Sequence, residues 1–378
     1  MKGSVVITRS NPVSPDPRVE KFATALSNCG LRLMIVAWDR KGQFPDEEIK
    51  SFGQIYRIKI HGDYGSGVKN LLNVLFWNIA LLFALIRNKG KFQIIHACDF
   101  DTIIPALICK LLFRKKVVYD VFDFYADMLR KAPDFLRRII RRVDLFLMKF
   151  PDAVILADDS RIEQIKGSKP KRLTIIYNSL PFDFFKDFLD NSQQKHDSFH
   201  IAYVGLLQLE RGIIPMINVV KKHSKWHLTL AGYGGDEELI KKEVSTTFNI
   251  KLLGRIPYEE ALKIYANCEV MFATYDPSIP NHRFSSANKL FESMALGKPI
   301  IVARDTSMDK IVEKYNLGFV VNYGNEDELE KVLLEISSWD EAKKKEFAIN
   351  SLNIYKEYFS WEKMEERLRS LYDEILGY

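Results

Sequence analysis

Short apolar runs recur along the whole chain and alternate with longer segments whose apolar residues are spaced as on one face of a helix. Apolar runs of this length, bounded by polar or turn residues, are typical of buried β-strands. In the first half of the chain they predict strands at residues 5–8, 33–37, 94–97, 117–120, 153–156 and 174–177. In the second half they predict strands at residues 200–204, 227–231, 250–253, 270–274, 299–302 and 319–321.

Helices fit between the predicted strands. Asp16 and Pro17 suit the cap and first turn of one of them. The residues that share one face of that helix are Val19, Phe22, Ala23 and Leu26. Because strands that alternate with helices form parallel sheets covered on both faces, the pattern predicts an α/β fold with doubly wound parallel sheets.

The chain has 378 residues, which is too long for one ordinary core and suits two domains. The polar stretch at 187–198, DFLDNSQQKHDS, is the best candidate for a linker between them. The domains are therefore expected at residues 1–186 and 199–360. A last helix follows within 361–378, with one apolar stripe formed by Met364, Leu368, Leu371, Tyr372 and Ile375.

The composition is that of a soluble globular protein, with 47% hydrophobic and 28% charged residues. The four cysteines are scattered without C-x-x-C spacing, so we expect reduced thiols and neither disulfides nor zinc ligands. No N-terminal signal peptide is expected, because Met1 leads almost directly into the first strand. The apolar run at 71–86 is shorter than the roughly 20 residues that span a membrane, so it predicts a buried or interfacial helix.

Residues 135–150, FLRRIIRRVDLFLMKF, have the pattern of a basic amphipathic helix. One face carries Leu136, Ile139, Ile140, Val143 and Leu147, and beside it lie Arg137, Arg138, Arg141, Arg142 and Lys149. Such a helix can rest on an anionic membrane surface, where each cation adds about 1 kcal/mol. It can equally be a packing helix with a solvated basic side. Nucleic acid is not an expected partner, because no basic–aromatic groove pattern is present.

Residues 288–301, NKLFESMALGKPII, predict a helix followed by a strand. Ser285 or Ser286 can cap this helix, and Gly297 supplies its stop. Lys289 and Glu292 share one face near the positive end of the helix. A cation beside free backbone N–H groups suits a diphosphate, and a carboxylate one turn on can accept two ribose hydroxyls. The pair therefore indicates a sugar-nucleotide site, although it also fits a solvated pair on a surface helix.

In this segment the chain resembles the donor-site helix of the family 4 retaining glycosyltransferases, which have the GT-B fold of two Rossmann-like domains facing a central cleft. One branch of the family has Pro-Asn-Lys-Leu-Phe-Glu here, and Ala287 replaces the proline. The resemblance covers nearly the whole chain. It implies that 1–186 binds the acceptor, that 199–360 binds the nucleotide sugar, and that the final helix packs back on the N-terminal domain. Phe284 stands where many members carry a glutamate.

The donor side of the resemblance includes YVGLLQLERG at 203–212. A strand that ends in Gly205 lets backbone approach a phosphate, and Arg211 has the planar fork that binds phosphate oxygens. An exposed arginine after a strand is the alternative interpretation. The family often has a cation directly after the glycine; because Leu206 is there, Arg211 and Lys289 are left to serve the diphosphate. At 252–257, LLGRIP, the resemblance implies that Arg255 and Ile256 contact the nucleobase.

The acceptor side begins at IHACDFD, residues 95–101, at the carboxyl end of a predicted parallel strand. Family members often have His-x-His-Asp here; His96 and Asp99 match, and Cys98 replaces the second histidine. The next strand end brings further carboxylates to the same rim, with Phe122 where relatives commonly have histidine; these are Asp120, Asp123 and Asp127. Such carboxylates can hold or help deprotonate acceptor hydroxyls, or they can cap helices.

Arg18 lies in the first strand–helix loop, NPVSPDPR. It is expected either to face the interdomain cleft or to form a surface ion pair. The catalytic set predicted from the sequence is Asp99, Asp123, Arg211 and Lys289, with Arg18 and His96 on the acceptor side and Ser285 and Ser286 on the donor side.

The sequence therefore predicts a cytoplasmic glycosyltransferase, peripheral on the inner face of the cell membrane. It would move a hexose or N-acetylhexosamine from a UDP- or GDP-linked sugar to a glycan or lipid-linked glycan, with retention of configuration, as the resemblance implies. No cofactor or metal is expected, because the cations and a helix N-terminus offset the diphosphate charge. The alternatives are a sugar-nucleotide epimerase of the same fold and a nucleotide-binding scaffold without transfer activity.

Overall fold

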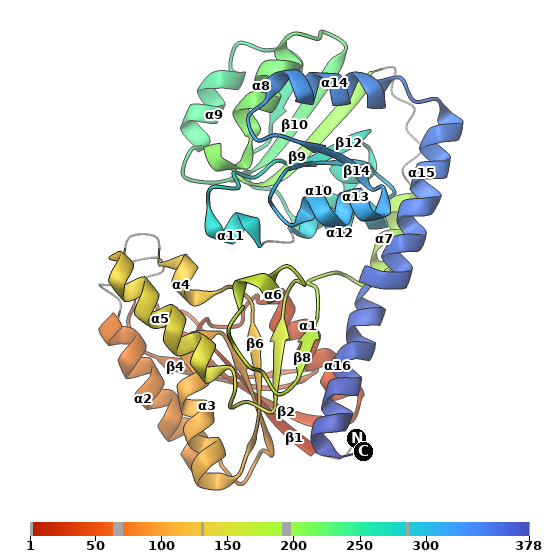
Figure 1. The fold of residues 1–378 in the computed structure, drawn as a ribbon. Helices are drawn as coiled ribbons and strands as arrows, with labels where there is room; N and C mark the ends of the chain where they lie inside the picture. The colour runs from red at the N-terminus through yellow and green to blue at the C-terminus, as the bar shows by residue number, and fades with distance from the viewer. Residues whose placement is uncertain (1–2, 63–70, 130–131, 191–197, 285–286, 378) are drawn as a thin grey trace. The chain divides into compact units, whose positions relative to one another are not determined.

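The computed structural model describes residues 3–62, 71–129, 132–190, 198–284 and 287–377. The chain divides into two compact units, one formed by Met1–Asn178 with Met364–Tyr378 and the other by Ser179–Lys363. Each unit is built around a largely parallel sheet, as Figure 1 shows, so the predicted α/β fold class is confirmed.

The sheet of the first unit has the strand order β3-β4-β2-β1-β5-β6-β7-β8. The bounds are β1 Gly3–Arg9, β2 Leu31–Asp39, β3 Glu47–Lys50, β4 Gly53–Lys59, β5 Ile94–Cys98, β6 Lys116–Val121, β7 Ala153–Leu156 and β8 Leu173–Ile175. Neighbouring strands are parallel except for the β3–β4 hairpin. This hairpin was not predicted from the sequence, because β3 (EEIK) is short, charged and largely exposed and therefore lacks the apolar run of a buried strand.

Helices cover both faces of this sheet. They are α1 Pro17–Asn28, α2 Leu71–Arg87, α3 Phe100–Phe113, α4 Tyr125–Met128, α5 Asp134–Leu147, α6 Arg161–Gln164 and part of α16 Trp361–Leu376. Asp16 caps α1 as predicted, because its carboxylate accepts from the Val19 N–H at 3.2 Å. Alternate side chains of β5 face opposite layers: Ile95 packs in the core with α2, α3 and α5, whereas His96 meets α1 and α16.

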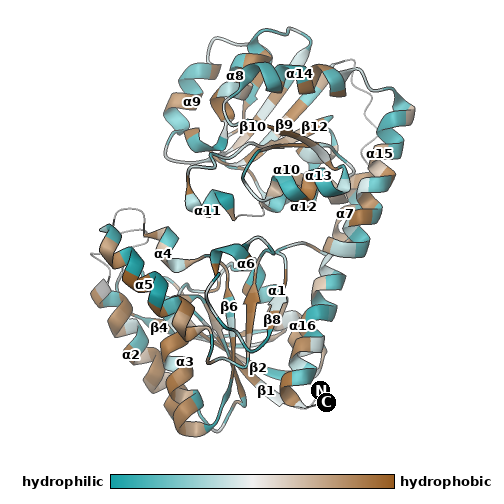
Figure 2. Ribbon diagram, in the orientation of Figure 1, coloured by the Kyte–Doolittle hydropathy of each residue, from teal (hydrophilic) through white to brown (hydrophobic). Residues whose placement is uncertain are grey.

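The outer layer of α2, α3 and α5 is strongly apolar in α2 and α3, as Figure 2 shows. Trp77, Leu81 and Leu85 of α2 are buried, but Leu72, Phe76 and Phe83 are exposed. The run at 71–86 therefore forms the helix that was predicted, with one buried and one open face. Within the described ranges, no helix has both the length and the apolarity needed to cross a membrane.

The second unit has a six-stranded parallel sheet in the order β11-β10-β9-β12-β13-β14. Its strands are β9 Phe199–Leu206, β10 Trp226–Tyr233, β11 Ile250–Leu252, β12 Val270–Ala273, β13 Ile300–Ala303 and β14 Gly318–Val321. Its helices are α7 Asp183–Asp190, η2 Leu209–Arg211, α8 Ile213–Lys221, α9 Glu237–Val244, α10 Tyr258–Ala266, α11 Pro280–Arg283, α12 Asn288–Ala295, α13 Met308–Tyr315, α14 Glu326–Ser337, α15 Glu341–Ile354 and η3 Tyr355–Phe359.

The units meet at residues 178 and 179 along the chain, and not at residue 186. The cause is α7, whose Phe185 is buried and whose Phe184 stacks on Tyr258 of α10, so this segment belongs to the second unit. At the other end of the chain, α16 packs in the first unit from Met364 onward. There the Tyr372 hydroxyl lies 2.7 Å from Nδ1 of His96, and Arg367 donates to the Ile175 carbonyl at 3.1 Å.

Candidate functional site

A cavity of about 350 Å³ opens in the second unit at the carboxyl ends of its strands. It is lined by the end of β9, the start of α10 and the first turns of α12, and the residues are Tyr203, Val204, Gly205, Leu206, Arg211, Tyr258, Ala261, Tyr265, Tyr275, Ala287, Asn288, Lys289 and Glu292. The edge where parallel strands end is the usual ligand edge of doubly wound sheets. Four of the predicted donor-site residues, Gly205, Arg211, Lys289 and Glu292, thus line one cavity.

Lys289 and Glu292 are both buried, with 7% and 5% of their surfaces exposed. The interpretation as a solvated surface pair is therefore wrong. The residue before α12 is Ala287, which has no side chain able to cap the helix, and Ser285 and Ser286 lie outside the described residues. Gly297 ends the helix as predicted, with a φ of +66° that favours glycine.

Lys289 stands against aromatic rings and the backbone of β9. Its Nζ donates to the Tyr275 hydroxyl at 3.3 Å and lies 4.4 Å from the centroid of the Tyr203 ring. A Cβ at position 205 would lie 2.7 Å from that nitrogen, so glycine is what lets the lysine lie over the strand end. The ammonium is thereby held at the floor of the cavity.

Arg211, at the end of η2, meets Lys289 at the same tyrosine. Its guanidinium carbon lies 4.3 Å from the centroid of the Tyr275 ring, and its Nε is buried without a hydrogen-bond partner among the described residues. Throughout the part of the chain that the structure describes, neither Arg211 nor Lys289 has a carboxylate within ion-pair distance. Two cations from different elements, η2 and α12, therefore converge without an ion-pair partner among the described residues, which is an arrangement suited to an anion.

Glu292 is fixed by Tyr258 at the start of α10. The Tyr258 hydroxyl donates to Oε1 of Glu292 at 2.6 Å, and its ring stacks on Phe184 of α7. Burial raises the pKa of Glu292 above its ordinary value of 4.5, while the hydrogen bond from Tyr258 and the charge of Lys289 act in the opposite direction. An acceptor oxygen is thus held one helical turn from Lys289, in the cavity that Arg211 also lines.

Two predicted donor residues lie elsewhere. Arg255 packs 4.9 Å from the Tyr233 ring, after β11, and neither it nor Ile256 lines the cavity. Leu206 does line it and is 40% exposed. Tyr203, Tyr258 and Tyr275 were not predicted from the sequence. Tyr203 lies within β9, Tyr275 follows β12 and Tyr258 begins α10, and these positions indicate the ligand edge only once the sheet is known.

The predicted acceptor residues meet at the carboxyl ends of the strands of the first unit. Arg18 binds Asp120 through Nη2–Oδ1 at 2.8 Å and Nε–Oδ2 at 3.2 Å, and Nε2 of His96 lies 3.3 Å from the same carboxylate. Burial alone would raise the pKa of Asp120, but Arg18 and His96 hold it below its ordinary value. Arg18 is 5% exposed, so the expectation of a surface ion pair is wrong.

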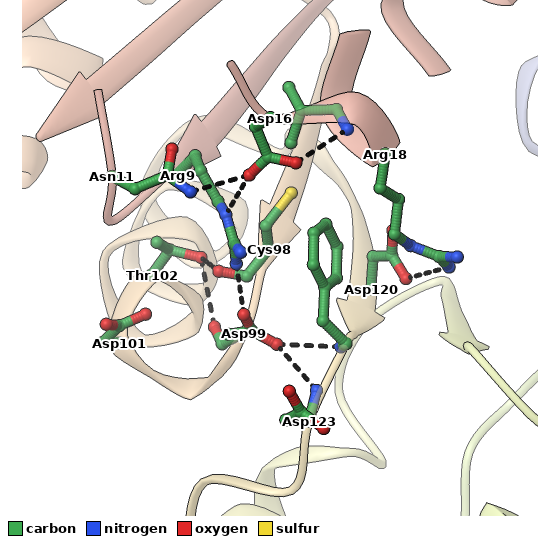
Figure 3. Close-up of polar contacts among 12 residues, drawn as sticks. Arg9, Asn11, Asp16, Arg18, Cys98, Asp99, Asp101, Thr102, Asp120 and Asp123 are labelled. Carbon is green, nitrogen blue, oxygen red and sulfur yellow. Dashed lines mark hydrogen bonds and ion pairs between the residues drawn. The ribbon is translucent and has the colours of Figure 1, made fainter. Parts of the chain in front are cut away.

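Asp99 is the centre of a second cluster, drawn in Figure 3. Its Oδ1 accepts from the Phe122 N–H at 2.8 Å, and its Oδ2 pairs with Arg9. Arg9 also donates to Asp16 at 2.8 Å and covers the Phe122 ring at 4.1 Å. Asp99 has φ +64° and ψ 169°, a conformation that side chains rarely adopt and that is frequent at functional sites. Burial raises its pKa to about 7, although Arg9 opposes the shift.

The carboxylates of this rim bind other side chains and do not cap helices. Asp99 precedes α3 but makes no capping bond. Asp123 accepts from Arg161 at 2.8 Å, and Asp127 accepts from Gln164 at 2.7 Å. Arg9 was missed by the sequence analysis; the available signal was a cation at the end of the first parallel strand.

His96, Cys98 and Asp120 bring three potential metal ligands within 4.8 Å of one another. All three are buried, and Asp120 already binds the Arg18 guanidinium with both oxygens. Burial also raises the pKa of Cys98 well above its ordinary value, which keeps the thiol protonated. The carboxylate of this trio is therefore already neutralised by the Arg18 guanidinium.

Comparison with known proteins agrees with this architecture. The first unit and the second together resemble sucrose-phosphate synthase from Thermosynechococcus elongatus, with a TM-score of 0.79 and 16% identity over 99% of each chain. HepE from Anabaena, solved in complex with UDP-glucose, matches with a TM-score of 0.70 and 15% identity over 98% of this chain and 100% of that one. The catalytic domain of starch synthase IV from Arabidopsis thaliana, solved with ADP and acarbose, matches over 100% of both chains with a TM-score of 0.70 and 11% identity. A search of curated proteins found no significant match.

The chain thus has the GT-B fold. Residues 185–351 match the family model of the glycosyl transferases group 1, and this part of the chain is a domain of that family. The match includes every residue that lines the 350 Å³ cavity. The resemblance drawn from the sequence is therefore confirmed for the fold, and for the family within residues 185–351.

Proposed function

We propose that the protein transfers a hexose or N-acetylhexosamine from a UDP- or GDP-linked sugar to a glycan or lipid-linked glycan, with retention of configuration. One observation carries this proposal: Arg211 and Lys289 converge on Tyr275 without an ion-pair carboxylate among the described residues, and the buried Glu292 lies one helical turn from Lys289. Two cations and an acceptor are what a diphosphate and a ribose require. The complexes of HepE with UDP-glucose and of starch synthase IV with ADP support a nucleoside diphosphate as the ligand.

In the proposed reaction, the bond between the anomeric carbon and the diphosphate oxygen breaks while an acceptor hydroxyl oxygen bonds to the same face of that carbon. Arg211 and Lys289 stabilise the departing diphosphate, whose charge is greatest as the bond breaks. The diphosphate takes the proton of the acceptor hydroxyl. Because these two cations and the start of α12 offset the charge, we propose that no metal or other cofactor is needed.

The groups of the first unit receive refined roles. Both oxygens of Asp99 are engaged, by Arg9 and by the amides after β6, so we assign it the positioning of that loop. Arg18 and His96 are buried beside Asp120, and we assign them a positioning role as well. Asp123, whose side chain is 49% exposed, is the carboxylate proposed to contact acceptor hydroxyls. Arg255 and Ile256 remain proposed nucleobase contacts.

We further propose that the protein works in the cytoplasm on the inner face of the cell membrane. The helix α5 supports this location, because it exposes Phe135, Ile139 and Phe146 together with Arg138 and Arg142. Exposed apolar side chains flanked by cations are the composition of helices that lie in an anionic interface.

A thermal-shift panel of nucleoside diphosphates and their sugars tests the donor, because a ligand that binds only the folded protein raises its melting temperature. We expect stabilisation by UDP or GDP and by a sugar of that nucleotide. Incubation of that sugar nucleotide with a glycolipid extract, with and without EDTA, should then yield a glycosidic product of unchanged anomeric configuration. Conversion of the sugar without an acceptor would identify an epimerase, and binding without any turnover would identify a scaffold; either result contradicts the proposal.

A further inference from the structure

A second cavity, of about 440 Å³, lies in the first unit between α4 and α5. It is far along the chain from the donor residues and shares none of them. Three of the residues that line it are arginines, and the complete set is Ala126, Asp127, Asp134, Arg137, Arg138 and Arg141.

The acidic residues of this cavity are already engaged, whereas part of the arginine surface is not. Asp127 accepts from Gln164, and Asp134 pairs with one Nη of Arg137. The Nε of Arg137 is buried and has no hydrogen-bond partner in the described chain. A buried N–H without a partner is costly, and an anion that enters the cavity would satisfy it.

Arg141 gives the cavity a rigid wall. Its Nη2 donates to the Gln164 carbonyl at 2.8 Å, and its guanidinium carbon lies 5.0 Å from the centroid of the Phe124 ring. An arginine fixed in this way keeps its remaining N–H groups oriented without further loss of side-chain entropy. Planar forks held in place are suited to phosphate oxygens.

The surroundings of the cavity indicate which kind of molecule would carry a phosphate that binds there. The same helix exposes Phe135, with 60% of its surface accessible, and Ile139, with 50%. Elsewhere in the same layer of helices, Phe76 and Phe83 of α2 and Leu111 of α3 are also exposed. Because α2, α3 and α5 pack on one core, their outward sides belong to one layer of the unit, as Figures 1 and 2 show. An arginine cavity beside exposed apolar side chains fits a ligand that is anionic at one end and apolar at the other.

We propose that the α4–α5 cavity binds the phosphate group of a membrane lipid through Arg137, Arg138 and Arg141, while the exposed apolar side chains enter the acyl region. This inference rests on the proposed membrane location but does not require that any sugar be transferred. It goes beyond general attraction to a charged surface, because it assigns one phosphate to one cavity.

The full-length protein is tested by sedimentation with two kinds of phosphatidylcholine vesicles. One contains phosphatidic acid, which presents a terminal phosphate, and the other contains phosphatidylglycerol at the same measured surface charge. We expect tighter binding to phosphatidic acid. The double variant Arg137→Gln/Arg138→Gln should lose this preference. The control Arg142→Gln removes an exposed cation of the same helix outside the cavity; it should weaken binding to both vesicles by about fivefold and keep the preference.

The outcomes separate the possible failures. Equal binding of wild-type protein to both vesicles, or a preference that Arg142→Gln removes as completely as the double variant does, would overturn the assigned cavity while leaving membrane attachment intact. If the protein sedimented with neither kind of vesicle, both the cavity assignment and the proposed membrane location would be overturned. Titration with inorganic diphosphate tests a soluble ligand. If the wild type binds diphosphate, the double variant does not, and neither vesicle is preferred, the cavity binds a free phosphate compound and the proposed lipid ligand is wrong.

Discussion

Tyr258 donates a 2.6 Å hydrogen bond to Oε1 of Glu292, and this bond joins the start of α10 to the donor helix α12. The glutamate is buried, and Tyr258 binds Oε1 of its carboxylate and not Oε2. A fixed carboxylate with an oxygen to spare is what the proposed ribose contact requires.

Glu292→Gln should weaken binding of the nucleoside diphosphate by about 1–3 kcal/mol, because it removes charge-assisted hydrogen bonds to the ribose. The fold should persist, since burial disfavours the charged form of this side chain and a neutral amide of the same shape fits. Isothermal titration calorimetry measures the loss. Glu260→Gln, an exposed change on α10, is the matched control and should bind as the wild type does. Equal affinities of all three proteins would remove Glu292 from the site.

Arg211→Ala and Lys289→Ala should each lower kcat by roughly 10²–10³-fold, the range for losing one electrostatic donor in a transition state. Because both cations act on one charge centre, the double variant should depart from the sum of the single effects. Arg211→Lys should recover little, since an ammonium cannot reproduce the fork that lies over Tyr275. Strict dependence of the wild-type rate on added Mg²⁺ or Mn²⁺ would assign the charge to a metal instead.

Leu206→Arg should partly rescue Arg211→Ala. Leu206 lines the donor cavity and is 40% exposed, so a longer cationic side chain has room at that position. We expect kcat to recover by about tenfold, which corresponds to about 1.4 kcal/mol. Leu206→Gln in the same background is the control for size without charge. If the glutamine variant recovers as much activity as the arginine variant, the rescue is not electrostatic.

Asp99→Asn should change how stability depends on pH. Burial raises the pKa of Asp99 from 3.8 to about 7, so the folded protein holds a proton that the unfolded chain releases. The stabilisation that this bound proton gives is fully present at pH values below the ordinary pKa of 3.8 and is lost as the pH rises through about 7. As the pH increases across that window, the melting temperature of the wild type should therefore fall relative to that of Asp99→Asn, so that the two curves converge or cross. Parallel curves would mean that Asp99 titrates normally.

Reversal of Arg137, Arg138, Arg141 and Arg142 to glutamate should abolish sedimentation with anionic vesicles and leave nucleotide binding unchanged, because these residues lie in the first unit, away from the donor cavity along the chain. Wild-type protein should detach as salt rises, since the attraction decays within a Debye length of about 8 Å at physiological ionic strength. Sedimentation that ignores both the charge reversal and the salt would leave α5 as an ordinary packing helix.

Local patterns were sufficient to predict most of the fold. The predicted strands overlap β1, β2 and β5–β14. Buried parallel strands are short apolar runs, which can be recognised in a sequence without knowing which strands lie beside them in the sheet. The cap of α1 by Asp16 and the shared face of Lys289 and Glu292 were also predictable, since both depend on the geometry of a few consecutive residues. The hairpin β3–β4 was not, because its strands carry mostly polar or charged side chains.

The sequence by itself therefore determined which residues lie together along each helix and which strands are buried, whereas only the tertiary structure decided which elements meet. Arg9 and Asp99 are 90 positions apart and become partners because β1 and β5 are neighbours in the sheet. The same applies to Tyr258 with Glu292, and to the division of the basic residues of α5 between a cavity and open solvent. Strand order and side-chain burial arise from long-range packing, and a local periodicity of two or 3.6 residues carries no information about them.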